Sequence, residues 1–367
     1  MCLGEKKKVL MICESFGGGV FAYVSQLCND LVDEFDVYMA YSVRPQTPKN
    51  YLELIDSKVN MIEIEEFKNF SMKDIIVKGY GIINALKKLE REINPDIIHL
   101  HSSIAGGFGR IAFRDLKKNI VYTPHGYAFI LLGPGLKSKA YYFFEKILAK
   151  FNNTISLTCC ESEESVAKEF SDRTHYIETG ISIEKFSKII PMIEKKSTKI
   201  KIFTLGRICK QKRPSLFNEI AKNFPDISFV WIGDGELRNQ LTAHNVEITG
   251  WKNRAEALKI ASECDVFILC SYGEAIAMSL LENMYMKKLC IVSNTVGNKS
   301  VIHNKCNGYV CESINDYIYA IKEIVKEFPI HYVEKAYNDI INVYNTKMMK
   351  KKYIDYYTGL IKNSRYY

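Results

Sequence analysis

Short apolar runs alternate along the chain with longer segments in which apolar residues recur every three to four positions. The short runs have the length and β-branched content of strands, and the longer segments have the period of amphipathic helices. This alternation is typical of βαβ units, so it predicts an α/β protein with parallel sheets. In the first half the predicted strands are Val9–Cys13, Asp36–Tyr41, Asn60–Ile64, Asp96–His101, Ile120–Thr123, Ser156–Cys159 and His175–Glu178.

The alternation lapses between residues 180 and 198 and then starts again. The interval contains Pro191 and a Glu-Lys-Lys-Ser-Thr tract, which is the composition of a linker. We therefore place a domain boundary near residue 190, with a second α/β domain at residues 191–345. Its predicted strands are Ile200–Leu205, Ser228–Ile232, Val246–Ile248, Val266–Cys270, Leu289–Val292 and Tyr309–Cys311.

Beyond Asn315 only helical periods remain. The last helix is predicted at residues 345–362, and a helix of this length needs a surface to cover. The apolar residues that recur in it near helical spacing are Met349, Tyr353, Tyr356, Leu360 and Ile361.

Glycines and unusual polar residues stand directly after many of the predicted strands. Strands of a parallel sheet point the same way, so the residues that follow them line one crevice. We therefore expect the chemistry at the carboxyl ends of the strands. The residues at such places are Gly17–Gly19, Ser102–Ser103, His125–Gly126, Gly206–Arg207, Gly233–Gly235 and Ser271–Glu274.

The length and composition agree with two domains around a shared cleft. The chain has 367 residues, of which 47% are apolar and 25% charged, so it can bury cores and is not a disordered chain. Its longest apolar runs, such as Val266–Cys270, are far shorter than the ~18 residues that cross a bilayer. Only five apolar residues follow Lys8, too few for a secretory leader. We expect the protein to stay in the cytosol.

The cysteines indicate the redox state of the chain, and the distribution of charge indicates the class of ligand. The eleven cysteines form no C-x-x-C pair and lie mostly in apolar runs, so we expect reduced core residues. Residues 1–190 carry 24 basic and 24 acidic side chains, whereas residues 191–367 carry 26 and 18. A basic half attracts phosphates of nucleotides, nucleic acids or anionic lipids. Aromatic residues are not interleaved with the basic clusters, which argues against nucleic acid.

Gly206 and Arg207 follow the first strand of the second half. Lys212 stands five residues later, just before a helix that is predicted to start near Pro214. Charge-assisted hydrogen bonds contribute about 1.5–3 kcal/mol each, so the two cations predict a diphosphate site. A solvated basic loop is the alternative.

Glu274 and Glu282 are eight residues apart, which is about 12 Å along a helix axis. Two carboxylates that hydrolyse one glycosidic bond stand about 5–9.5 Å apart, so a hydrolase pair is a poor fit. A helix that starts near Ala277 would offer its N–H groups to an anion, with Ala275 and Ile276 lining the same site. Sugar, diphosphate and ribose would fit between the carboxylates in that order. The alternative is that both glutamates are ordinary helix residues.

Other candidate sites are weaker. Gly17–Gly19 lacks the G-x-G-x-x-G spacing, and no acidic residue follows at the distance of a ribose contact, so a nicotinamide or flavin enzyme is disfavoured. His125 could bond a sugar hydroxyl, shuttle a proton or be structural. His99 and His101 share a strand without a third ligand, so we interpret them as structural. No Asp-x-Asp pair offers a metal site. We expect no metal and no other cofactor, because fixed cations take the metal's place.

Together these motifs resemble the retaining glycosyltransferases of family 4, which have the GT-B fold. The resemblance covers nearly the whole chain and is strongest to members that build bacterial capsular or exopolysaccharide repeat units. The strings that carry it are Gly17-Gly18-Gly19-Val20, Pro95–His101, Thr123–Gly126, Ser162-Glu163, Thr179–Ser182, Gly206-Arg207 with Lys212, Gly233–Glu236, and Glu274-x7-Glu282.

The resemblance implies two Rossmann-like domains that face a cleft. Residues 1–190 would bind the acceptor, residues 191–345 the nucleotide-sugar donor, and residues 346–367 would form a helix that crosses back onto the first domain. Gly18 and Gly19 would close on the phosphate and the acceptor, and His125 would bond the transferred sugar.

In the donor domain the resemblance implies that Arg207 and Lys212 bind the diphosphate beside Gly206. Glu282 would bind the ribose hydroxyls, and Glu274 the transferred sugar. The residues that follow Glu274, and the string Gly297–Ser300, depart from the frequent pattern of the family. These departures touch the sugar pocket and leave the diphosphate site intact.

The implied activity is metal-independent transfer of a hexose or N-acetylhexosamine, with retention, from a nucleoside diphosphate sugar, first of all a UDP-sugar. The acceptor would be a lipid-linked glycan or an oligosaccharide, and a peripheral membrane contact is open, although solvation of Lys347–Lys352 is the simpler interpretation of those lysines. A nucleotide-sugar 2-epimerase is one alternative, but it would need carboxylates where the first half offers chiefly Glu14 and Glu161. A non-catalytic nucleotide-sugar-binding subunit is the other.

Overall fold

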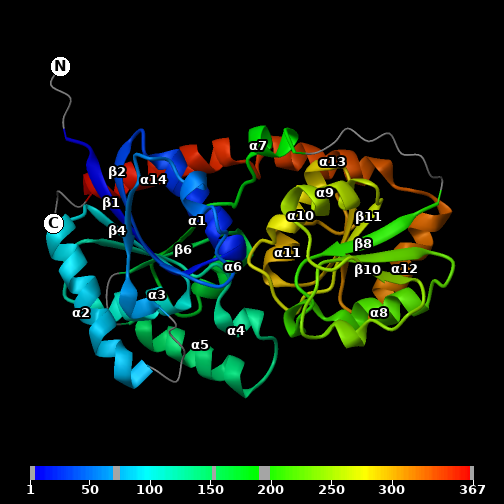
Figure 1. Ribbon diagram of the computed structural model, residues 1–367, viewed down its shortest axis with the longest axis horizontal. Helices are drawn as coiled ribbons and strands as arrows, with labels where there is room; N and C mark the ends of the chain where they lie inside the picture. Colours follow the sequence, from blue (N-terminus) through cyan, green and yellow to red (C-terminus); the bar gives the residue numbers. More distant parts are fainter. Residues whose placement is uncertain (1–4, 69–74, 151–153, 190–198, 364–367) are drawn as a thin grey trace. The chain divides into compact units, whose positions relative to one another are not determined.

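The computed structural model describes residues 5–68, 75–150, 154–189 and 199–363. The chain divides into two units (Figure 1). The first unit comprises residues 1–129, 134–179 and 346–367, and the second comprises residues 130–133 and 180–345. The boundary that we predicted near residue 190 lies outside the described residues.

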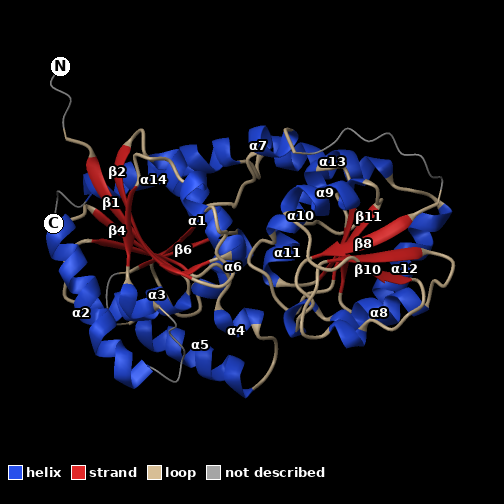
Figure 2. Cartoon of the chain, viewed as in Figure 1, coloured by secondary structure: helices blue, strands red, loops and turns tan. Residues whose placement is uncertain are grey.

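The first unit is built on a parallel sheet of seven strands in the order β3-β2-β1-β4-β5-β6-β7 (Figure 2). All seven strands predicted in this part of the chain are confirmed. Val9–Cys13 in the central strand β1 is fully buried, as expected where helices cover both faces of a sheet. The strands are β1 Lys7–Phe16, β2 Phe35–Val43, β3 Asn60–Glu63, β4 Ile97–His101, β5 Asn119–Thr123, β6 Ile155–Thr158 and β7 Thr174–Tyr176.

Helices cover both faces of this sheet. One face carries α1 and α14, and the other carries α2, α3 and α5, with α3 packed against both α2 and α5 (Figure 1). The helices of the first unit are α1 Gly18–Leu31, α2 Ile75–Ile93, α3 Ser103–Ala112, α5 Leu136–Leu148, α6 Glu161–Ala167 and α14 Thr346–Asn363, with short turns at Tyr51–Leu54 and Glu65–Phe67. The short helix α4 Ala128–Leu131 spans the division between the two units.

The predicted closing helix is confirmed as α14, and it packs on the first unit. The hydroxyl of Tyr353 lies 2.6 Å from that of Tyr23 on α1. The buried residues of α14 are Met349, Tyr353, Tyr357 and Ile361. Tyr356 and Leu360, which also recur near helical spacing, are only half-buried, and Tyr357 belongs to the buried stripe instead. Steps of four residues drift around a helix by about 40° each, and this drift carries the buried stripe away from Tyr356.

The second unit has a parallel sheet of six strands in the order β10-β9-β8-β11-β12-β13 (Figure 2). All six predicted strands are confirmed. They are β8 Lys201–Leu205, β9 Ser228–Ile232, β10 Val246–Ile248, β11 Val266–Leu269, β12 Leu289–Ser293 and β13 Tyr309–Cys311. The helices are α7 Ile183–Ser187, α8 Pro214–Lys222, α9 Arg254–Ser262, α10 Met278–Tyr285, α11 Val296–Val301, α12 Ile314–Lys326 and α13 Ile330–Asn342, with short turns at Lys210–Lys212 and Arg238–Gln240.

The described residues include ten of the cysteines, all as free thiols. Eight are buried, as predicted, but Cys209 is half-buried and Cys306 is exposed, so the prediction of core positions is wrong for these two. Both stand in loops: Cys209 directly precedes the short turn Lys210–Lys212, and Cys306 lies between α11 and β13. Within the described part of the chain, no helix combines the length and the apolar character needed to span a membrane.

Candidate functional site

The loops after β8 and β9 lie against each other at the carboxyl ends of these strands. The backbone N–H of Gly206 donates to the carbonyl of Ile232 (2.9 Å), and that of Ile208 donates to Asp234 (2.8 Å). Gly233 has φ +138°, and a Cβ at this position would lie 2.2 Å from the carbonyl oxygen of Gly206. Only glycine permits this approach at position 233, and Gly206 has φ +145°, which also favours glycine.

A second set of contacts joins the loop after β8 to the loop after β11. The side chain of Gln211 donates to the carbonyl of Gly273 (2.8 Å), and the N–H of Tyr272 donates to the carbonyl of Gln211 (2.9 Å). The guanidinium of Arg213 lies 4.6 Å from the centre of the Tyr272 ring. Helix α8 begins at Pro214 as predicted. These contacts fix the position of the two loops relative to each other.

The arrangement of these two loops places Lys212 next to Glu274. The Nζ of Lys212 lies 2.6 Å from Oε1 of Glu274, and the two side chains are only 17% and 10% exposed. Two of the residues that the sequence assigned to a donor site are therefore direct partners. An anion that reached Lys212 would compete with Glu274 for the same ammonium.

Arg207 lies at the rim of the same edge. Its Nε and Nη2 lie 3.1 and 3.0 Å from Oε2 of Glu236, and both side chains are more than half exposed. The pKa of Glu236 is lowered, first by its own backbone N–H and also by Arg207. Exposed ion pairs contribute little to stability. Arg207 can therefore exchange Glu236 for a ligand at little cost.

Helix α10 starts at Met278, directly after Ala277, as predicted. No side chain caps this start, so its first N–H groups are available to an anion. Glu274 stands in the preceding loop, so the estimate of 12 Å along a helix axis does not apply to the whole interval. Gly297 packs closely against this loop. Its N–H donates to the carbonyl of Glu274 (3.0 Å), and a Cβ on Gly297 would lie 1.2 Å from the carbonyl oxygen of Ala275.

Glu282 lies on α10 and is buried. Burial raises the pKa of its carboxyl, and Arg254 opposes the rise through a contact of 2.6 Å from Nη2 to Oε1. Arg254 begins α9, and its guanidinium also lies 5.6 Å from the centre of the Phe186 ring. Arg254 was not among the predicted site residues. Its only local signal is a cation directly after Asn253, which caps α9.

In the first unit, Gly18 and Gly19 open helix α1 immediately after β1. Gly18 has φ +54°, and a Cβ on either glycine would have nothing within 4 Å. There is therefore room beside this backbone for another group. The neighbouring Glu14 is buried, accepts a hydrogen bond from the N–H of Ala105 (3.0 Å) and accepts another from the hydroxyl of Ser102. Burial raises the pKa of Glu14.

His125 occupies the loop after β5 with φ +54°. Its Nε2 lies 3.0 Å from Nδ1 of His101, and its Nδ1 lies 3.8 Å from the sulfur of Cys159. Burial lowers the pKa of His125 to about 3. The ring is therefore neutral at ordinary pH and suits hydrogen bonding better than proton transfer.

The histidines interpreted as structural are fully buried. His99 lies between the hydroxyls of Tyr357 (2.5 Å from Nδ1) and Thr123 (2.8 Å from Nε2). The contact of His101 with His125 was missed, although it follows from topology: β4 and β5 are neighbours, and His101 pairs with Thr123. Burial lowers the pKa of both His99 and His101.

Glu163 on α6 holds the loop that carries His125. Its carboxylate accepts the N–H groups of Gly126 (2.9 Å) and Cys159 (3.0 Å), and it is fully buried. Burial raises its pKa to about 6. The sequence analysis named Glu163 only as part of a string. Among the residues that the structure describes, no group of three or more His, Cys, Asp or Glu side chains could hold a metal ion.

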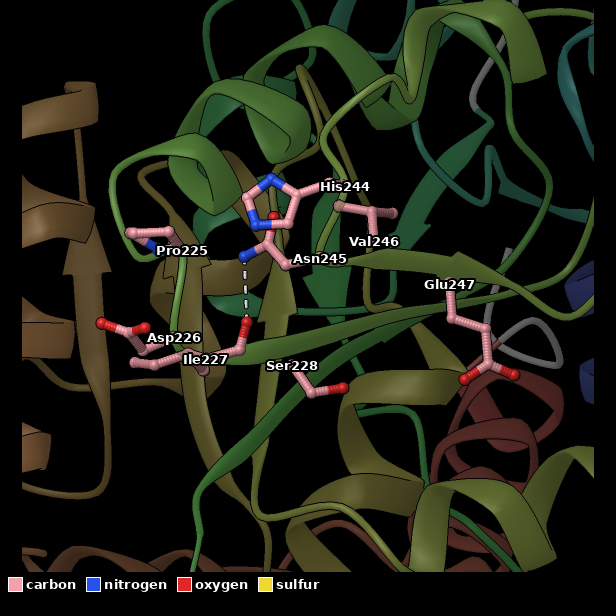
Figure 3. Close-up of a pocket in the computed structure, with 8 residues that line it drawn as sticks. All are labelled: Pro225, Asp226, Ile227, Ser228, His244, Asn245, Val246 and Glu247. Carbon is pink, nitrogen blue, oxygen red and sulfur yellow. Dashed lines mark hydrogen bonds between the residues drawn. The ribbon is translucent and has the colours of Figure 1, made fainter.

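A pocket of about 370 Å³ opens at the amino ends of β9 and β10, the opposite end of the sheet from these loops (Figure 3). The side-chain amide of Asn245 donates to the carbonyls of Ala221, Phe224 and Ile227 at 2.9–3.1 Å. Asn245 thus braces the turn that precedes β9. We assign no ligand to this pocket.

Comparison with known proteins identifies the family. Two family models match successive parts of the chain, Glycosyltransferase Family 4 at residues 17–185 and Glycosyl transferases group 1 at residues 185–339. The UDP-Gal:alpha-D-GlcNAc-diphosphoundecaprenol alpha-1,3-galactosyltransferase of Escherichia coli is 31% identical over 325 residues, which cover 78% of this chain and 81% of that protein. The chain belongs to glycosyltransferase family 4. The resemblance drawn from the motifs is confirmed at this level.

Solved structures place this glycosyltransferase in the GT-B fold, as expected. Sucrose-phosphate synthase from Thermosynechococcus elongatus superposes with a TM-score of 0.80 at 14% identity, covering 98% of this chain and 100% of that one. The Anabaena protein Alr3699/HepE, solved in complex with UDP-glucose, gives 0.73 at 13% identity over 96% and 99% of the two chains. At such low identity the likeness concerns the fold alone.

Proposed function

We propose that this glycosyltransferase transfers a hexose or an N-acetylhexosamine from a UDP-sugar to a lipid-linked glycan in the synthesis of a surface polysaccharide. The observation that carries the proposal is the Lys212–Glu274 ion pair, which stands directly before the uncapped start of α10. The E. coli relative, named for UDP-Gal and a diphosphoundecaprenol-linked acceptor, supports this choice of donor and acceptor.

The donor diphosphate would bind to Arg207, to Lys212 and to the first N–H groups of α10. These groups lie in the loop after β8 and at the end of the loop after β11. Each cation already holds a carboxylate, so binding would exchange one anionic partner for another. This exchange avoids leaving an ammonium or a guanidinium without a counter-charge. The cations and the helix start would then stabilise the charge that grows on the leaving UDP.

Glu282 would accept hydrogen bonds from the ribose hydroxyls. A carboxylate accepts strongly only when ionised, and burial favours its neutral form. Arg254, 2.6 Å away, opposes that effect. We therefore propose that Arg254 keeps Glu282 ionised.

In the second unit, the transferred sugar would meet Glu274 once Lys212 has turned to the diphosphate. In the first unit, the neutral ring of His125 and the backbone of Gly18 and Gly19 remain substrate contacts that the family resemblance implies. Retention would follow from attack of the acceptor hydroxyl on the face from which UDP leaves. The new glycosidic bond forms as the bond to UDP breaks, and a phosphate oxygen of UDP takes the proton of the hydroxyl.

No metal enters this scheme, because Arg207 and Lys212 supply the positive charge. A lipid-linked acceptor also implies that the enzyme works at a membrane surface, as a peripheral protein.

The test is a transfer assay with a panel of UDP-sugars and a diphospho-polyprenol-linked glycan. We expect one donor to be consumed only in the presence of acceptor, with an unchanged anomeric configuration in the product by NMR and undiminished rates in EDTA. Arg207→Met, Lys212→Met and Glu282→Ala should each lower kcat/KM at least about tenfold. Full rates in all three variants would refute the assigned site, and donor conversion without acceptor would indicate an epimerase instead.

A further inference from the structure

Helix α5 of the first unit has apolar residues on the face that points away from the sheet. Leu136, Phe143, Phe144 and Ile147 are 86%, 62%, 58% and 37% exposed. Together with the exposed Ala140 they recur at steps of three and four, so they form one continuous stripe. We call these five residues the α5 stripe. Water-exposed apolar stripes of this kind mark a docking surface.

Buried contacts on the opposite face of α5 fix the orientation of this helix in the first unit. The opposite face of α5 is held by Glu145, which is buried and lies 2.7 Å from Nη2 of Arg110 on α3. The same carboxylate accepts a hydrogen bond from the hydroxyl of Tyr122 (3.0 Å), and Leu148 is buried beside it. These contacts fix which face of α5 points inward, and therefore which points outward.

The exposed charged side chains of α5 itself are all basic, and the exposed carboxylate of Glu169 accepts a hydrogen bond from the hydroxyl of Tyr142 beside them (2.9 Å). Four exposed lysines flank it, and the only carboxylate in α5 is the buried Glu145. The lysines are Lys137, Lys139, Lys146 and Lys150. An apolar stripe bordered by lysines is the pattern of a helix that lies in the plane of a membrane interface, where the apolar side chains enter the acyl boundary and the ammonium groups meet lipid phosphates.

Two lysines of α14, the most basic of the described helices, form ion pairs within the first unit. Lys350 lies 3.8 Å from a carboxylate oxygen of Asp33, and Lys352 is paired with Glu178. The large apolar residues of α14 face the interior of the first unit. The combination of exposed apolar side chains and flanking lysines is therefore found on α5 and not on α14.

We propose that the α5 stripe docks this glycosyltransferase onto a bilayer that contains anionic lipids. A second copy of the chain fits less well, because a twofold contact through the stripe would bring two sets of lysines together. The inference deepens the proposed function, since a lipid-linked acceptor resides at such a surface. It concerns a surface distinct from the donor residues, so the two can fail separately.

The experiment measures co-sedimentation of the full chain with phosphatidylcholine vesicles, with and without phosphatidylglycerol. We expect binding to the anionic vesicles, and a loss of at least about tenfold in affinity for Phe143→Ser/Phe144→Ser. Lys139→Gln/Lys146→Gln should weaken binding to anionic vesicles by about fivefold per lysine. The matched control is Val325→Ser/Ile330→Ser, two exposed apolar residues of the second unit, which should bind as the wild type does.

Circular dichroism and calorimetric UDP binding complete the test. Every variant should keep its helix content and its affinity for UDP, because none of the changed residues belongs to the donor site. Wild-type affinity of Phe143→Ser/Phe144→Ser for anionic vesicles would overturn the proposal. Equal binding of the wild type to both kinds of vesicle would also overturn it. A third contrary result would be that the wild type forms a dimer, that Phe143→Ser/Phe144→Ser is a monomer, and that neither protein binds vesicles. Absence of UDP binding by the wild type would count against the proposed function and leave the vesicle result standing.

Discussion

Removing the charge of Glu274 should have opposite effects on UDP binding and on sugar transfer. In the structure Lys212 is engaged by Glu274 at 2.6 Å, so a diphosphate must displace a carboxylate before it gains the ammonium. Glu274→Gln keeps the size of the side chain and weakens this competition. UDP, which carries no sugar, should then bind more tightly. Transfer should become slower, because the proposed contact of Glu274 with the sugar would be lost.

The size of the effect follows from the geometry of the pair. A charge-assisted hydrogen bond contributes about 1.5–3 kcal/mol, and the low exposure of both side chains limits screening by water. If about 1.4 kcal/mol of this competition is removed, UDP binds about tenfold more tightly. Loss of one partner of a buried pair also costs stability, up to about 3–5 kcal/mol, and the amide of glutamine should recover part of it.

The assay is isothermal titration calorimetry of UDP with the wild type, Glu274→Gln, Lys212→Met and the double variant, with the free energy of unfolding of each from urea titration. Lys212→Met should weaken UDP binding at least tenfold. In the double variant the gain from Glu274→Gln should vanish, because no ammonium remains to be released. The cycle thus separates competition for Lys212 from a general change of the loop.

Weaker UDP binding in Glu274→Gln would refute this account, since Glu274 would then contribute to the diphosphate site. An equal gain in the presence and absence of Lys212 would refute it as well. Either result would leave the ion pair as a structural contact between two loops.

Three further predictions concern the residues around the two sites. Arg254→Met should raise the pKa of Glu282 further above its usual value, so UDP binding measured against pH should start to fall at a higher pH than in the wild type; superimposed profiles would contradict this. Gly233→Ala should lower the free energy of unfolding by several kcal/mol, because its Cβ would lie 2.2 Å from a backbone oxygen, whereas Gly359→Ala, with nothing within 4 Å, should change it by about 1 kcal/mol or less. Equal unfolding midpoints for these two variants would show that the loop yields. Burial keeps His99, His101 and His125 neutral in the fold, whereas in the unfolded chain they bind protons below a pKa of about 6.5. Each histidine should therefore lower the free energy of unfolding by about 1.4 kcal/mol per pH unit below that value. Glu163, whose pKa burial raises to about 6, acts in the opposite sense and offsets part of this loss. His101→Gln should show a shallower fall in urea titrations between pH 7 and 5, and an unchanged slope would show that His101 is not buried as a neutral ring.

The strands were predictable because their signal is local. A run such as Val266–Cys270 is apolar at every position, which is what a central strand covered on both faces requires. The starts of α8 and α10 were predictable for the same reason, since Pro214 and the residues before Met278 mark them in the sequence. The candidate residues at the strand ends followed from the rule that parallel strands end at one edge.

The partners of those residues were not predictable. Lys212 and Glu274 are 62 positions apart, and Arg254 and Glu282 are 28 apart. Which pairs meet depends on the strand order and on the way that the loops stack, and a periodic pattern carries neither. His101 reaches His125 only because β4 and β5 are neighbours in the sheet.

The amino-acid sequence by itself determined the α/β class, the strands, the helix starts and the set of candidate site residues, because each depends on neighbours a few positions away. Tertiary structure alone decided which cation holds which carboxylate, which face of α14 is buried, and that α5 turns an apolar stripe outward. An amphipathic period is the same whether the apolar face meets a protein core or another surface, so only the packing of the helix distinguishes the two.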